Sequence, residues 1–157
     1  MALSYFAFGS NMLVERLAKR VPSARVLGTA SLVGYVLRFN KLSKDGSGKA
    51  NIVPSADPLA VVHGVLYHLD DDERFRLDKA EGLGNGYQVR WVRVRRDGAE
   101  ADDEAFTYVA APEAVRDALP PFQWYKNMVI EGAKQNRLPE SYVRKIEAVL
   151  AVEDPGR

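Results

Sequence analysis

The sequence lacks cysteine, has only two histidines, and contains no long apolar run. Without cysteine the chain has no disulfide framework, thiolate zinc site, iron–sulfur cluster or cysteine nucleophile. No stretch approaches the ~18 consecutive apolar residues of a membrane span, and the N-terminus has neither a basic leader nor a long apolar segment. We therefore expect a soluble, cytoplasmic protein with no membrane partner.

An excess of charge of either sign is also missing. The 22 Lys and Arg residues nearly balance the 21 Asp and Glu residues, which leaves a net charge of +1. Proteins that bind nucleic acids usually need a strong basic field to neutralise the phosphate backbone. The composition therefore argues against a nucleic-acid partner.

What is present is the composition of an ordinary globular domain. Of the 157 residues, 46% are hydrophobic and 27% are charged, and this is enough apolar material for a core of its own. We expect a single domain over residues 1–152, followed by a short C-terminal tail over residues 153–157.

The hydrophobic periodicity predicts mostly strands in the middle of the chain and helices near its ends. Expected strands cover residues 3–8, 60–69, 87–94 and 106–110, and a further extended segment over 24–40 is broken by Gly28 and Gly34. Expected helices cover 12–21, 70–81, 122–133 and a segment from about 140. Asp70 and Glu73 have the spacing of a capping box at the start of the second helix. This order predicts an α+β fold, a small mixed, mostly antiparallel β-barrel with flanking helices, and not a βαβ wound sheet.

Three familiar site patterns are incomplete. Residues 46–49 (GSGK) look like the end of a phosphate-binding loop, but Ser43 and Ala50 occupy positions that need Gly and Ser or Thr. His63 and His68 are five residues apart in a predicted strand and so point to opposite faces, which argues against a joint metal site. The Gly-x-Ser-x-Gly pattern of serine hydrolases is absent.

Residues 5–11 (YFAFGSN) are more informative. A strand that ends in Gly-Ser-Asn and leads into a helix presents several unpaired backbone N–H groups, and such a turn can bind an anion. The alternative is that Ser10 or Asn11 simply caps the helix.

The second informative segment is the end of the helix at residues 70–81. Glu81 is followed by Gly82, Gly84 and Gly86, so a carboxylate stands beside backbone that another group can approach closely. The alternative is that Glu81 is a solvated surface carboxylate, as most glutamates are. If it is held against aromatic side chains instead, burial would raise its pKa toward neutrality.

Together these segments resemble the gamma-glutamylcyclotransferase family. The matching stretches are residues 5–11, Leu77-Asp78 with Glu81-Gly82 and Gly86-Tyr87, and a C-terminal set of Tyr125-Lys126, Gly132-Ala133-Lys134, Leu138-Pro139 and Tyr142. They follow the order of the family and span nearly the whole chain.

The resemblance implies a small barrel fold, commonly a homodimer, that needs no cofactor and no metal. It also implies that the α-amine of a small gamma-glutamyl substrate attacks its own γ-carbonyl, which yields 5-oxoproline and a free amino acid or amine. The acid–base residue carries over to Glu81. The residues expected to bind substrate are Tyr5, Phe6, Ala7, Phe8, Gly9, Ser10, Tyr87 and Tyr108. Phe8 departs from the family, which frequently has Tyr there.

Three other functions stay open at this point. One is a cyclotransferase for gamma-glutamylamines or another gamma-glutamyl intermediate, since the leaving amine would contact loops such as 43–51. Another is a non-catalytic module that binds a small carboxylated metabolite. The third is an interaction scaffold that exposes an apolar stripe, for which Phe122, Tyr125 and Val129 are candidates.

Overall fold

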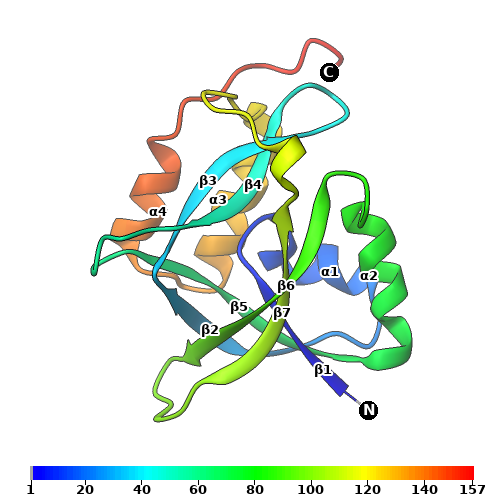
Figure 1. The fold of residues 1–157 in the computed structure, drawn as a ribbon, viewed down its shortest axis with the longest axis vertical. Helices are drawn as coiled ribbons and strands as arrows, with labels where there is room; N and C mark the ends of the chain where they lie inside the picture. The colour runs from blue at the N-terminus through cyan, green and yellow to red at the C-terminus, as the bar shows by residue number, and fades with distance from the viewer. Residues whose placement is uncertain (1) are drawn as a thin grey trace.

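A computed structural model of the chain describes residues 2–157 (Figure 1). The strands are β1 (Ala2–Ala7), β2 (Arg25–Val33), β3 (Tyr35–Leu42), β4 (Gly48–Pro54), β5 (Val61–Asp70), β6 (Tyr87–Arg96) and β7 (Asp103–Ala110). The helices are α1 (Val14–Arg20), α2 (Arg74–Glu81), α3 (Gln123–Gln135) and α4 (Glu140–Glu147), with short 3-10 turns η1 (Ser10–Met12), η2 (Asp71–Glu73) and η3 (Pro112–Ala114).

Five strands close into a barrel in the order β1-β5-β2-β6-β7. Every neighbouring pair is antiparallel except β1 and β7, which are parallel and close the barrel where Tyr5 pairs with Phe106. Large side chains such as Phe6, Leu66 and Phe106 are fully buried and fill the core. The predicted α+β fold with a mostly antiparallel barrel is confirmed.

The strands β3 and β4 form a separate two-stranded sheet, which Figure 1 shows above the barrel. Of the two breaks predicted within 24–40, the one at Gly34 is confirmed, because the chain turns there with a φ of 87°, which suits glycine. At Gly28 the strand continues with only a register shift. Beyond the turn at Gly34 the chain leaves the barrel and pairs locally. The ring of Phe39 on β3 packs edge-on against Tyr125 on α3, so the hairpin bridges the barrel and the C-terminal helices.

The C-terminal helices are buried along the predicted stripe. Phe122, Tyr125 and Val129 are 7%, 6% and 0% exposed. The apolar surface that an interaction scaffold would need is therefore absent at these three positions. The tail also contacts α3, since Trp124 Nε1 donates a hydrogen bond to Asp154 Oδ2 at 2.9 Å. Of the helices within residues 2–157, none is long and apolar enough to cross a membrane.

The two ends of α2 differ in how well the sequence predicted them. The capping box is wrong, because the side chain of Asp70 makes no cap hydrogen bond and Glu73 Oε1 instead accepts one from the amide of Ser23 at 2.7 Å. The C-terminal end is confirmed, because Gly82 takes the left-handed conformation (φ 68°) that ends a helix. Glu81 therefore sits on the last turn of α2.

Candidate active site

The turn η1 follows β1 directly, and two side chains hold it from other elements. Tyr67 Oη on β5 donates to the carbonyl of Asn11 at 2.9 Å, and Asn136 Nδ2 donates to the carbonyl of Met12 at 2.8 Å. Gly132 on α3 allows close contact, because a Cβ there would lie 2.8 Å from Met12 Cβ. The turn is thus fixed between the barrel and α3.

The backbone N–H groups of Gly9, Ser10 and Asn11 make no hydrogen bond to another group in residues 2–157. Neither Ser10 nor Asn11 caps a helix, because the starts of η1 and α1 show no side-chain cap hydrogen bond. The three donors are therefore available to an anionic group, which was the first of the two possibilities for this segment.

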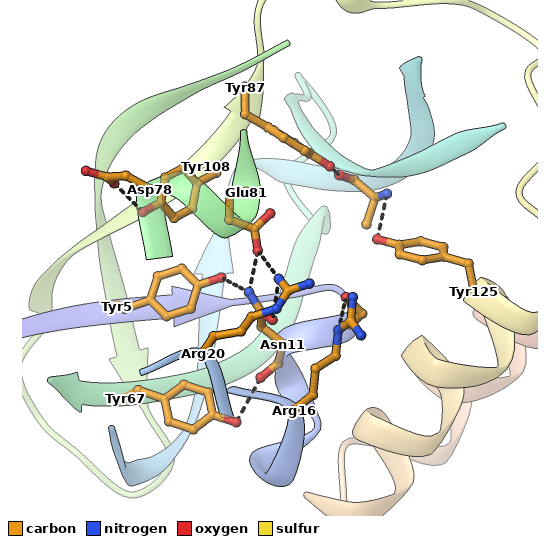
Figure 2. Close-up of polar contacts among 12 residues, drawn as sticks. Tyr5, Asn11, Arg16, Arg20, Tyr67, Asp78, Glu81, Tyr87, Tyr108 and Tyr125 are labelled. Carbon is orange, nitrogen blue, oxygen red and sulfur yellow. Dashed lines mark hydrogen bonds and ion pairs between the residues drawn. The ribbon is translucent and has the colours of Figure 1, made fainter. Parts of the chain in front are cut away.

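Glu81 faces this turn from α2, and its side chain is only 18% exposed (Figure 2). Asn11 Nδ2 donates a hydrogen bond to Glu81 Oε1, and Arg20 Nη1 lies 3.3 Å from the same oxygen. Arg20 Nη1 also lies 3.3 Å from Asn11 Oδ1, so the three side chains form one network. Glu81 is not a solvated surface carboxylate.

Burial raises the pKa of Glu81 above its ordinary range, because a charged carboxylate is poorly solvated there. Arg20 and Asn11 oppose this shift, since both favour the ionised form. The net direction is upward, toward the pH at which a carboxyl group can both accept and return a proton.

Two tyrosines on one side of Glu81 are held by hydrogen bonds to protein groups. Tyr5 Oη accepts from Asn11 Nδ2 at 3.1 Å, and Tyr108 Oη donates to Asp78 Oδ1 at 2.5 Å (Figure 2). Burial raises the pKa of both phenols, so both are neutral at ordinary pH.

Two further tyrosines lie on the side of the β3–β4 hairpin and share Ala50 as a partner. Tyr87 Oη donates to the carbonyl of Ala50 at 2.7 Å, and the amide of Ala50 donates to Tyr125 Oη at 3.1 Å. Burial raises the pKa of Tyr125 to about 12. Gly9 allows this close packing, because a Cβ there would lie only 3.0 Å from Ala50 Cβ.

The structure brings most of the predicted site residues into one inner pocket. Its lining includes Tyr5, Phe8, Gly9, Ser10, Glu81, Tyr87 and Tyr108. Phe6 and Ala7 do not line it. The side chain of Phe6 is on the opposite face of β1 from that of Tyr5, because side chains alternate along a strand, and Ala7 is buried in the core.

Four lining residues of the inner pocket were not predicted from the sequence as side-chain contributors: Asn11, Ala50, Thr107 and Tyr125. Arg16 and Arg20 were not predicted either. These two were detectable, because residues four apart on a helix share a face, and this face follows the YFAFGSN segment directly.

The inner pocket is small, about 30 Å³, and opens into a larger space of about 340 Å³. The two share Ser10, Glu81, Tyr87 and Tyr125. We call the larger space the basic vestibule, because six cationic side chains line it: Arg16, Arg20, Lys41, Lys44, Lys49 and Lys79. Ser43, Lys44 and Lys49 belong to the loop expected to contact the leaving amine.

Neither histidine lies at the pocket. His63 packs its ring against Tyr142, 4.9 Å between centroids, and His68 belongs to β5. Among the described residues 2–157, no group of three His, Asp or Glu side chains is placed to hold a metal ion. The polar groups that line the inner pocket include Glu81, the backbone donors, Thr107 and the tyrosines.

Comparison with known proteins adds sequence and fold relatives. Residues 61–146 match the AIG2-like family. The gamma-glutamylcyclotransferase of Mus musculus is 33% identical over 160 aligned positions, which cover 98% of this chain and 81% of that protein. The Homo sapiens protein of the same name is 34% identical over 152 positions, covering 92% and 77%. A solved structure described as a gamma-glutamyl cyclotransferase superposes with a TM-score of 0.89 at 30% identity, covering all of this chain and 93% of the other.

Proposed function

Because the chain belongs to the gamma-glutamylcyclotransferase family, we propose that it converts a gamma-glutamyl amino acid or amine into 5-oxoproline and the free amine. The observation that supports this reaction most directly is the position of Glu81. It is a largely buried carboxyl group next to three free backbone donors, and it opens onto a space large enough for a leaving group.

We assign both proton transfers to Glu81. Its ionised form takes a proton from the α-ammonium of the substrate, and the free amine attacks the γ-carbonyl carbon to close the five-membered ring. When the bond to the leaving nitrogen breaks, Glu81 returns the proton to that nitrogen. The released amine takes up the second proton of the ring nitrogen and departs as an ammonium ion, so Glu81 ends ionised, as it began. The upward shift of the pKa of Glu81 supports this role, because a proton carrier works best when its pKa is near the working pH.

The substrate is held, in this proposal, with its α-carboxylate on the amides of Gly9, Ser10 and Asn11. Charge-assisted hydrogen bonds to backbone N–H groups are strong, and they would place the α-amine next to Glu81. Holding the γ-glutamyl chain folded is itself a large part of the catalysis, since ring closure needs the amine and the carbonyl in contact. Phe8 lacks the hydroxyl common in the family, but these backbone donors do not depend on its side chain.

The experiment is to incubate the purified protein with a panel of gamma-glutamyl amino acids, glutathione and gamma-glutamyl-ε-lysine, and to follow 5-oxoproline and free amine by mass spectrometry. We expect 5-oxoproline from at least one substrate. A folded protein that binds glutamate or 5-oxoproline but releases no product from any substrate would favour the non-catalytic binding module instead.

Two further properties stay predictions. The resemblance implies a homodimer, and the sequence favours a cytoplasmic location. Sedimentation of the purified protein at several concentrations tests the first, and imaging of a tagged copy in cells tests the second.

A further inference from the structure

The basic vestibule concentrates positive charge in a chain that is nearly neutral as a whole. The six cations come from α1, β3, the β3–β4 loop, β4 and α2, and Glu81 is the single carboxylate among the lining residues. The chain has a net charge of +1. Like charges gathered around one opening repel each other, so this arrangement favours a negatively charged occupant.

Lys41 is the cation that most needs an anionic partner. The residue is only 8% exposed, and its ammonium lies 4.6 Å from the centre of the Tyr87 ring. Gly86 leaves room for it, because a Cβ at that position would lie 2.8 Å from Lys41 Cε. Within residues 2–157, Lys41 Nζ makes no ion pair and no hydrogen bond. The ammonium is reached from the vestibule and has no carboxylate partner there, so a carboxylate of a ligand can pair with it.

The remaining cations divide into paired and unpaired groups. Arg20 is paired with Glu81, and Lys49 with Asp45 at 3.3 Å. Arg16 Nε donates a hydrogen bond to Ser10 Oγ at 3.2 Å but pairs with no carboxylate in residues 2–157. Lys44 and Lys79 are exposed on two different elements and have no carboxylate partner in the part of the chain that the structure describes. Unpaired charge is therefore present at two depths, with Lys41 inside and Lys44 and Lys79 at the rim.

We propose that the basic vestibule selects a leaving amino acid with two carboxylates, so that the preferred substrate is a gamma-glutamyl compound of glutamate or aspartate. This inference rests on the proposed function, since the vestibule adjoins Glu81 on the side where the leaving group departs. The carboxylate next to the scissile nitrogen contacts Lys41, and the side-chain carboxylate reaches Lys44 and Lys79. Burial and the neighbouring Lys49 and Lys44 lower the pKa of Lys41, and a bound carboxylate would raise that pKa again.

The test compares gamma-glutamyl-glutamate with gamma-glutamyl-glutamine, which have nearly the same shape but differ in one charge. We expect kcat/KM to favour the glutamate compound by about tenfold, which is ~1.4 kcal/mol of transition-state binding. Raising the ionic strength from about 0.05 M to about 1 M should reduce this ratio, because salt screens the exposed rim lysines.

Substitutions separate the two depths. The double variant Lys44→Met with Lys79→Met should bring the ratio close to one. Lys41→Met should lower kcat/KM for both compounds, since both have the carboxylate next to the scissile nitrogen. Lys145→Met on α4 is the matched control, because it removes an exposed lysine outside the vestibule, and it should leave the ratio unchanged.

Equal kcat/KM for the two compounds, or a preference for glutamine, would overturn the inference while leaving the cyclotransferase proposal intact. If neither compound gives 5-oxoproline while another gamma-glutamyl compound of the panel does, the inference is overturned and the proposed function stands. If no compound of the panel gives 5-oxoproline, the proposed function fails, and thermal unfolding in the presence of gamma-glutamyl-glutamate and of gamma-glutamyl-glutamine then decides the inference. Greater stabilisation by gamma-glutamyl-glutamate, lost in the double variant, would support it, and equal stabilisation would overturn it.

Discussion

The inner pocket and the basic vestibule lie side by side, but they differ in whether their polar side chains already have partners within the protein. In the inner pocket Asn11 alone joins Tyr5, Glu81 and Arg20, so the side chains are held in place before any substrate binds. In the vestibule Lys41, Lys44 and Lys79 have no ion-pair partner among the described residues. Groups already held by the protein suit a fixed reaction, whereas unpaired groups suit recognition of a particular ligand. The comparison suggests that one region performs the cyclisation and the other selects the amine.

The largest effect is expected from Glu81→Gln, which keeps an oxygen that can accept from Asn11 but cannot accept a proton from the substrate. We expect kcat to fall by ~10²–10⁴-fold, the usual contribution of a general acid–base group. Rates of 5-oxoproline formation measure the effect, and Glu131→Gln, at an exposed position on α3, is the control. Near-normal turnover by a folded Glu81→Gln protein would remove Glu81 from the proposal.

The next effect tests whether the inner pocket depends on the close contact between α3 and η1. A Cβ at Gly132 would lie 2.8 Å from Met12 Cβ and 3.1 Å from the amide of Leu13. We expect Gly132→Ala to destabilise the fold by ~1–3 kcal/mol, as overpacking does, and to lower kcat by displacing η1. Urea unfolding measures the first change. Glu131→Ala on the same helix is the control. A Gly132→Ala protein that is more stable would contradict the prediction, because it would show that Met12 and Leu13 move aside without loss of stability.

A smaller effect is expected from Tyr108→Phe, because the hydroxyl of Tyr108 is directed at Asp78. Loss of this hydrogen bond should lower the free energy of unfolding by ~1 kcal/mol, while kcat changes little. Tyr35→Phe in the two-stranded sheet is the matched control. A loss of kcat as large as that of Glu81→Gln would instead assign the Tyr108 hydroxyl to the reacting groups.

The smallest change is a shift of the pH profile in Arg20→Met. Arg20 favours the ionised form of Glu81, so its removal should raise the pKa of Glu81 further. Because the reaction starts from the ionised carboxylate, the acidic limb of kcat/KM should move to higher pH. Arg144→Met on α4 should leave the limb in place, and an unmoved or lower limb in Arg20→Met would contradict the account.

The same two regions show what a sequence can and cannot predict. The inner pocket was largely predictable, because residues 5–11 are contiguous and Glu81 directly precedes the glycine that ends α2. The network around it was not, because Arg20 meets Glu81 across 61 residues of chain. The position of Lys41 at the vestibule could not be predicted for a similar reason, since it depends on the packing of β3 against Gly86 and Tyr87.

The fold divides in a similar way. Alternation and periodicity predicted the barrel strands and the buried stripe of α3, because burial of one face leaves a regular pattern. The separation of β2 from β3 was predictable too, because Gly34 marks the turn in the sequence. The failed capping box and the position of the β3–β4 hairpin were not, since Glu73 accepts from Ser23, which lies far from it in the sequence, and Phe39 packs on Tyr125. Such features arise from tertiary contacts that no local pattern records.

The most direct test of the central claim is to run the reaction in water enriched in the heavy oxygen isotope, with a substrate whose α-amine has a heavy nitrogen label. If the substrate's own amine is the nucleophile, the 5-oxoproline formed retains the nitrogen label and gains no heavy oxygen, and the released amine has no label. Glutamate that contains heavy oxygen from the solvent would show that water attacks the γ-carbonyl, and it would contradict the account.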